Sequence, residues 1–155
     1  MLLPPILLVG LDDAAASSLI ALLRRIGLAN PTLVCGQADA APALLEGTAS
    51  SRLPVVVLAS RAASGGDGLA VIEWMRLQQD AIAAIDAILL VEDEDDGWRA
   101  RAGELGVGTV ATPVEMRALI AALKALALPE QARIDPATLT VHVELLRRGT
   151  VLTRQ

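Results

Sequence analysis

The feature that most constrains the fold is a regular alternation between short apolar runs and longer segments of helical pattern. Apolar runs occupy residues 6–10, 32–35, 54–60, 87–91 and 108–111. The run PVVVLAS, residues 54–60, is rich in β-branched residues and has no polar alternation, as is typical of strands buried on both faces. Strands that alternate with helices predict a parallel sheet covered by helices on both faces and joined by right-handed crossovers.

The intervening segments carry helix signals. Asp12 is a predicted N-cap, leucines and isoleucines recur at helical spacing between residues 19 and 26, and Gly27 predicts the end of this first helix. Further helices are expected over about residues 39–45, 68–79, 92–106 and 114–126. In the helix expected over residues 92–106, the acidic run at residues 92–96 would open the helix and interact with its dipole, which we favour over a cation site.

We expect a domain of residues 1–127 and a C-terminal extension of residues 128–155. Asp135 and Pro136 favour the start of a sixth helix, which is our expectation for the extension. Residues 138–144 also alternate in polarity and are rich in β-branched residues, so a strand or hairpin arm remains the alternative. Its apolar side chains must be buried either on the same domain or on a second subunit: Leu139, Val141, Val143 and Leu145.

Composition narrows the function. A net charge of −5 argues against nucleic acid as a direct partner, because phosphate binding needs a basic surface. The apolar N-terminal segment lacks a basic region and is too short to span a bilayer, so we expect a cytoplasmic protein without a membrane partner. Cys35 is the single cysteine; it has no partner for an internal disulfide, and we expect a small buried side chain. His142 is the single histidine and has no second ligand near it in the sequence, so no metal site is expected.

Four strings, taken in order and spacing, resemble the response-regulator receiver domains of two-component signalling over about residues 5–126. They are Ile6-Leu-Leu-Val9, Ser64-Gly-Gly-Asp-Gly-Leu69, Glu104-Leu-Gly106 and Thr112-Pro-Val114. Gly27-Leu-Ala-Asn30 is similar to small receivers associated with bacterial phytochromes. The resemblance implies a doubly wound α/β fold of the CheY or flavodoxin type, with five parallel strands in the order 2-1-3-4-5. It leaves open whether the Thr112–Pro113 bond is cis.

The resemblance also implies where a phosphorylation site would lie. Such receivers carry an acidic pair after the first strand that binds Mg²⁺, a phosphoryl-accepting Asp, a Thr or Ser after the fourth strand, and a Lys before the last helix. The matching positions here are Gly10 and Leu11 for the acidic pair, then Ser60, Val91 and Thr112 in turn. We therefore expect no Mg²⁺ or other cofactor and no enzymatic activity.

These replacements predict a phosphorylation-independent module for protein interaction or dimerisation. Its expected partner is a histidine kinase, a phytochrome-like sensor, another regulator or a second copy of the chain. The alternative is a phosphoryl-accepting regulator with an unconventional site that uses Ser60, Asp12 or Asp13. A small-ligand binder or enzyme at the strand ends ranks last, because the chain has no phosphate loop or triad spacing.

Two tryptophans suggest where a partner would bind. Trp74 and Trp98 occupy positions that are usually polar in the resembled family, and they are expected on neighbouring helices of one face. Together with Arg99 and Arg101 they would form a partly exposed interaction patch. The alternative is that each indole covers its neighbours within the monomer.

Overall fold

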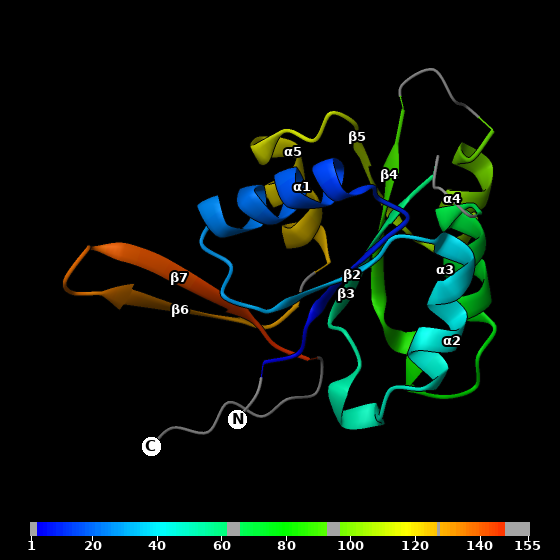
Figure 1. Ribbon diagram of the computed structural model, residues 1–155, viewed down its shortest axis with the longest axis horizontal. Helices are drawn as coiled ribbons and strands as arrows, with labels where there is room; N and C mark the ends of the chain where they lie inside the picture. Colours follow the sequence, from blue (N-terminus) through cyan, green and yellow to red (C-terminus); the bar gives the residue numbers. More distant parts are fainter. Residues whose placement is uncertain (1–2, 62–65, 93–96, 127, 148–155) are drawn as a thin grey trace.

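The centre of the protein is a five-stranded parallel sheet in the order β2-β1-β3-β4-β5 (Figure 1). The computed structural model describes residues 3–61, 66–92, 97–126 and 128–147. The strands are β1 (Ile6–Val9), β2 (Thr32–Cys35), β3 (Val56–Ser60), β4 (Asp86–Val91) and β5 (Gly108–Ala111). The expected fold class and strand order are confirmed.

Helices cover both faces of this sheet (Figure 1). One face carries α1 (Asp13–Arg25) and α5 (Met116–Ala125); the other carries α2 (Ala41–Glu46), α3 (Gly68–Arg76) and α4 (Arg99–Leu105). Short 3₁₀ turns lie at Ala38–Ala40, Ser50–Arg52 and Ala81–Ala84. Successive strand residues point to opposite faces, so Leu7, Val57 and Leu89 pack under α2, α3 and α4, whereas Leu8, Leu58 and Leu90 pack under α1 and α5.

The helix ends follow the sequence signals in part. The Asp12 carboxylate accepts a hydrogen bond from the Ala15 amide at 2.7 Å and caps α1 as predicted, and Gly27 adopts a φ of +92° just past its end. The fourth helix differs from our expectation, because α4 begins at Arg99 rather than at the acidic run. Asp93 to Asp96 lie outside the described residues.

The C-terminal extension is a hairpin of β6 (Glu130–Asp135) and β7 (Thr140–Leu145), and the expected sixth helix is wrong. Asp135 starts a turn instead of a helix: its carboxylate accepts from the Ala137 amide at 2.9 Å, and its carbonyl accepts from the Leu139 amide at 2.7 Å. Leu139 has a φ of 57°, which ends any helical path. The period-two alternation was the stronger signal, and the alternative interpretation is correct. The hairpin projects from the body as an arm (Figure 1).

Across the part of the chain that the structure describes, no helix is both long and apolar enough to cross a membrane.

Candidate functional site

The carboxyl ends of the parallel strands meet at one edge of the sheet, where open α/β sheets usually bind ligands. Gly10 follows β1 with a φ of +79°, and its amide donates to the Cys35 carbonyl at 2.8 Å. Leu11 comes next, is 9% exposed, and packs into the apolar cluster under α1 and α5. An aliphatic side chain therefore fills the space after the first strand.

Ser60 ends β3 and lies half-buried opposite Leu90 of β4. The first residue of α3 approaches it so closely that a Cβ added to Gly68 would lie 2.3 Å from the Ser60 carbonyl oxygen. Val91, the last residue of β4, is buried among apolar neighbours. At these two strand ends, the side chains thus offer one hydroxyl and one aliphatic group.

Thr112 follows β5 and turns back on the end of β4. Its amide donates to the Val91 carbonyl at 2.8 Å, and its hydroxyl lies 3.3 Å from the same oxygen. The Thr112–Pro113 bond is cis, which answers the question that the sequence left open. Both polar groups of Thr112 are therefore directed to the main chain at this turn.

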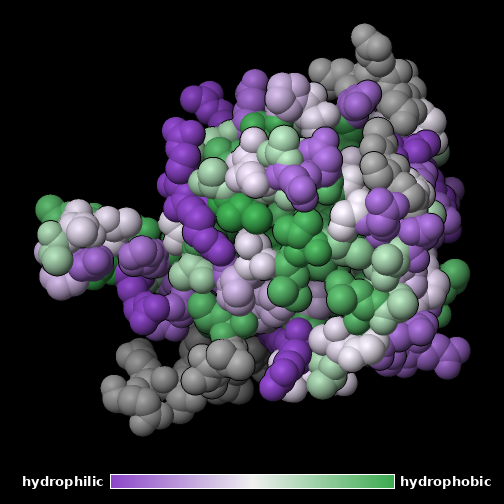
Figure 2. Space-filling view, in the orientation of Figure 1, coloured by the Kyte–Doolittle hydropathy of each residue, from purple (hydrophilic) through white to green (hydrophobic). Residues whose placement is uncertain are grey.

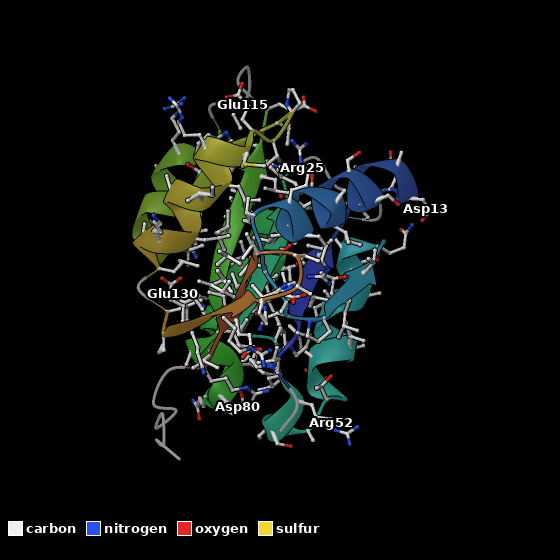
Figure 3. All side chains as sticks on the ribbon, turned by 90° about the vertical axis from the view of Figure 1, so that its left-hand side faces the viewer. Asp13, Arg25, Arg52, Asp80, Glu115 and Glu130 are labelled. Atoms are coloured by element: carbon white, nitrogen blue, oxygen red, sulfur yellow. The ribbon has the colours of Figure 1, made fainter. Side chains whose placement is uncertain are left out.

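Three charged groups near this edge, Asp12, Arg61 and Asp67, have structural partners. Arg61 and Asp67 form an ion pair at 2.6 Å, and the second Asp67 oxygen accepts from the Leu69 amide at the start of α3. Asp12 caps α1, while Asp13 lies exposed in the first turn of that helix (Figure 3). Within the described ranges, no three His, Cys, Asp or Glu side chains gather as a metal site.

An apolar pocket of about 300 Å³ adjoins these strand ends, between α1 and the turn before α5. Leu11 and Leu90 form part of its wall, and Thr112 and Ser18 contribute the hydroxyl-bearing side chains. The remaining lining residues are Ala15, Leu19, Leu22, Pro113 and Val114. No charged side chain lines this pocket.

The expected tryptophan patch is wrong for Trp98, which is only 7% exposed and packs in the core under α3 and α4. Trp98 stands at the N-cap of α4, which begins at Arg99, and its indole lies in the core beneath the helix. The indole Nε1 has no hydrogen-bond partner among the described residues. Trp74 lies half-buried against the same cluster. The Arg99 guanidinium lies 5.1 Å from the centre of the Trp98 ring.

Arg101 lies on the surface, where it binds Glu104 at 2.7 Å and Glu73 at 3.2 Å. The hydrogen bonds to Glu104 and then Glu73 raise the pKa of Arg101 above its usual value. Cys35 is half-buried rather than buried, and burial raises the pKa of its thiol. His142 is exposed on β7 opposite Arg133.

The arm carries an apolar surface that could bind a partner, and the expected helix would have arranged its residues differently. One face of the hairpin is apolar from Ala132 to its outer end, with Glu130 at its base, and its outer half is exposed: Ile134 is 66% exposed and Val141 is 48% exposed. Leu139 at the tip is 77% exposed. The inner half of this face, Val143 and Leu145, packs on the body of the domain. The alternation of residues 138–144 was the signal that could have located this face.

The base of the arm borders an apolar groove of about 520 Å³. Figure 3 looks along the arm and shows α1 and α5 on the same side of the sheet, with Glu130 at the start of β6. The end of α1, α5 and the hairpin all contribute lining residues, with Lys124 and Glu130 as the charged members. The apolar members are Ile26, Leu28, Ile120, Leu123, Leu128, Val143 and Leu145.

Comparisons by sequence find no matching protein-family model and no matching curated protein. Comparison of structures finds the bacteriophytochrome response regulator AtBRR, with a TM-score of 0.69 and 29% identity, over 81% of this chain and 93% of that one. The bacteriophytochrome response regulator RtBRR matches with a TM-score of 0.72 and 25% identity, over 88% and 84% of the two chains.

A signal receiver domain from Colwellia psychrerythraea shares the fold at 22% identity, with a TM-score of 0.66 over 80% of this chain and 98% of its own. The chain thus has the CheY-like fold of receiver domains, and it resembles the bacteriophytochrome response regulators.

Proposed function

We propose that this receiver acts without phosphorylation, as a non-enzymatic module for protein interaction that needs no Mg²⁺. The observation that carries the proposal is the chemistry of the strand ends. Leu11 lies packed where a metal-binding carboxylate is expected, and Ser60 stands at the acceptor position. Phosphoryl transfer needs a cation or other positive group to offset the charge that builds on the phosphate. Here the matching side chains are a hydroxyl or aliphatic, and the adjoining pocket has no charged lining.

The arm supplies the interaction surface of this module. Its exposed outer part carries Ile134, Leu139 and Val141, and Figure 2 shows green atoms among white and purple ones on the arm that projects at the left. A two-stranded hairpin gains little stability from an apolar face that stays in water. We therefore infer that this face is a surface for binding a protein.

A second copy of the chain is the occupant that the geometry favours. The same molecule carries both a projecting apolar arm and, at the arm's base, an apolar groove. Under a two-fold axis, each arm would lie along the groove of the other copy, which closes the assembly with two identical contacts. Lys124 and Glu130 at the groove supply opposite charges for such an exchange. The resulting dimer would present a fixed surface to a histidine kinase, a phytochrome-like sensor or another regulator.

The decisive experiment for phosphorylation independence is a titration with Mg²⁺ and beryllofluoride, a mimic of an acyl phosphate, read by tryptophan fluorescence. Trp98 packs in one cluster with Ala59 and Val91, next to the strand ends, so its emission reports a rearrangement there. We expect no saturable change at millimolar ligand. A saturable, Mg²⁺-dependent change would contradict the proposal and favour an unconventional phosphoryl-accepting site.

Variants would then locate that site. Ser60→Ala removes the hydroxyl at the acceptor position, and Asp13→Asn removes an exposed carboxylate. Asp12→Asn removes the charge at the cap of α1 but keeps a side chain that accepts the Ala15 amide. A response that disappears in one of these three variants identifies the group that binds the mimic.

A further inference from the structure

The junction between α1 and β2, residues 27–30, holds the base of the arm as a neighbouring strand would. Val143 of β7 donates its amide to the Gly27 carbonyl and accepts the Ala29 amide at 2.8 Å. These bonds form a parallel bridge between Leu28 and Val143. The hairpin is therefore bonded through its main chain to a loop of the domain, in addition to its side-chain packing.

Gly27 permits this close approach. Its φ of +92° lies in the left-handed region, and a Cβ added there would lie 2.6 Å from the Val141 carbonyl oxygen. The obstacle is main chain, which has no rotamer with which to move aside. Only glycine combines this conformation with this contact.

Asn30 extends the junction by one further pair of bonds through its side chain. It is fully buried; its amide nitrogen donates to the Leu145 carbonyl at 2.9 Å, and its oxygen accepts the Leu145 amide at 2.8 Å. The same nitrogen donates to the Pro4 carbonyl at 2.8 Å. The carboxamide thus satisfies both main-chain groups of one β7 residue and joins that strand to the start of β1.

We propose that residues 27–30 form a clasp that sets the direction of the arm, with Asn30 as its positioning residue. The inference rests on the proposed function, because the outer arm residues Ile134 and Val141 lie beyond the clasp and would meet the partner. A free two-stranded ribbon is marginally stable in water, so its direction depends on how its base is held. A held arm binds a partner more tightly than a loose one, because less conformational freedom is lost on binding.

Hydrogen exchange of individual amides tests the clasp in the full-length protein. In Asn30→Ala, we expect the Val143, Leu145 and Ala29 amides to exchange at least about tenfold faster relative to the Leu8 and Leu58 amides of the central sheet. The expected pattern is local opening of the arm while the sheet stays closed.

The matched control is Ile82→Ala, which removes buried apolar volume on the opposite face of the sheet, away from the hairpin. In this variant, hydrogen exchange of the arm amides is expected to accelerate no more than that of the sheet amides. Gly27→Ala is a second test, because it disturbs the main-chain contact of the clasp and leaves the Asn30 side chain in place. It should show the same selective opening of the arm, and it replaces Asn30→Ala if that variant does not fold. Equal acceleration of arm and sheet in the clasp variants would overturn the proposal.

Self-association, measured by sedimentation, separates the clasp from the proposed function. Asn30→Ala leaves Ile134 and Val141 in place, so weaker association, by about tenfold, reports lost direction rather than lost contacts. If the arm opens but association keeps its affinity, the clasp does not position the binding surface and the inference fails. If the unaltered protein does not associate at all, the proposed dimer fails, while the exchange pattern still decides whether the clasp exists.

Discussion

At the scale of single residues, the strand-end edge depends on one glycine that the family resemblance could place but not explain. Gly68 begins α3, and its α-carbon approaches the Ser60 carbonyl so closely that a methyl group has no room. The contact is with main chain at the end of a central strand, which cannot move without disturbing the sheet. The shape of this edge therefore requires glycine at residue 68, whatever group stands at residue 60.

Gly68→Ala is expected to lower the free energy of unfolding by about 2 kcal/mol or more, because an added Cβ would overlap the Ser60 carbonyl. Gly103→Ala is the matched control, since that glycine lies exposed inside α4 with nothing within 4 Å of an added Cβ. The control should stabilise the protein by about 0.5–1 kcal/mol through helix propensity. Urea denaturation of both variants checks the pair, and an unchanged Gly68→Ala midpoint would show that the edge is deformable.

Trp98 shows what sequence alone misses at this scale. Its position is usually polar in the resembled family, and on that ground the indole is expected in a partly exposed surface patch. The local sequence does not contain the position of the helix start, which decides the direction of the side chain. Once α4 begins at Arg99, the indole lies under the helix and fills the core.

At the scale of elements, the hairpin is the feature in which two local patterns compete. Asp135-Pro136 is a good helix start, and a helix would have placed Leu139, Val143 and Leu146 on one face. In the hairpin, Ile134 pairs with Val141 and Ala132 with Val143, so the apolar residues share one face of the ribbon instead. The strand pattern prevails because the inner half of that face is buried on the domain.

The bare outer half predicts how the arm binds. Replacing both Ile134 and Val141 by Ser is expected to convert a self-associating protein to a monomer, because the variant removes apolar contact area at the centre of the proposed interface. Leu77→Ser is the control: Leu77 is 76% exposed after α3, on the other side of the sheet. Light scattering coupled to gel filtration gives the masses, and a dimer that survives the double variant would place the interface elsewhere.

At the scale of the whole molecule, the base of the C-terminal extension packs on the domain of residues 1–127. Leu128, Leu145 and Leu146 are all at least nine-tenths buried, and Asn30 finds two of its three side-chain hydrogen bonds on Leu145. Arg147 adds hydrogen bonds to the Ser50 and Leu53 carbonyls beneath the sheet. The base of the extension thus takes part in the same core as the five-stranded domain.

A chain that ends at residue 127 is therefore expected to be less stable than the full-length protein by about 3 kcal/mol or more, from lost apolar burial and an unsatisfied buried carboxamide. Urea denaturation followed by circular dichroism measures the difference. Leu77→Ser is the control, since it changes a side chain that is 76% exposed and lies outside the extension, and it should alter stability by about 0.5 kcal/mol at most. Equal stability of the two chains would show that residues 1–127 fold as a domain without help from the extension.

The sequence by itself determined the fold class, the strand order through its family resemblance, and the residues at the strand ends. Those features depend on local patterns: continuous apolar runs, the Asp12 cap, glycines at helix ends, and the spacing between them. Tertiary structure alone decided the hairpin, the burial of Trp98 and the clasp at residues 27–30. The physical reason is that each depends on contacts between segments far apart in the chain. The side chain of Asn30 meets the main chain of Leu145 only after the sheet and α1 have brought them together.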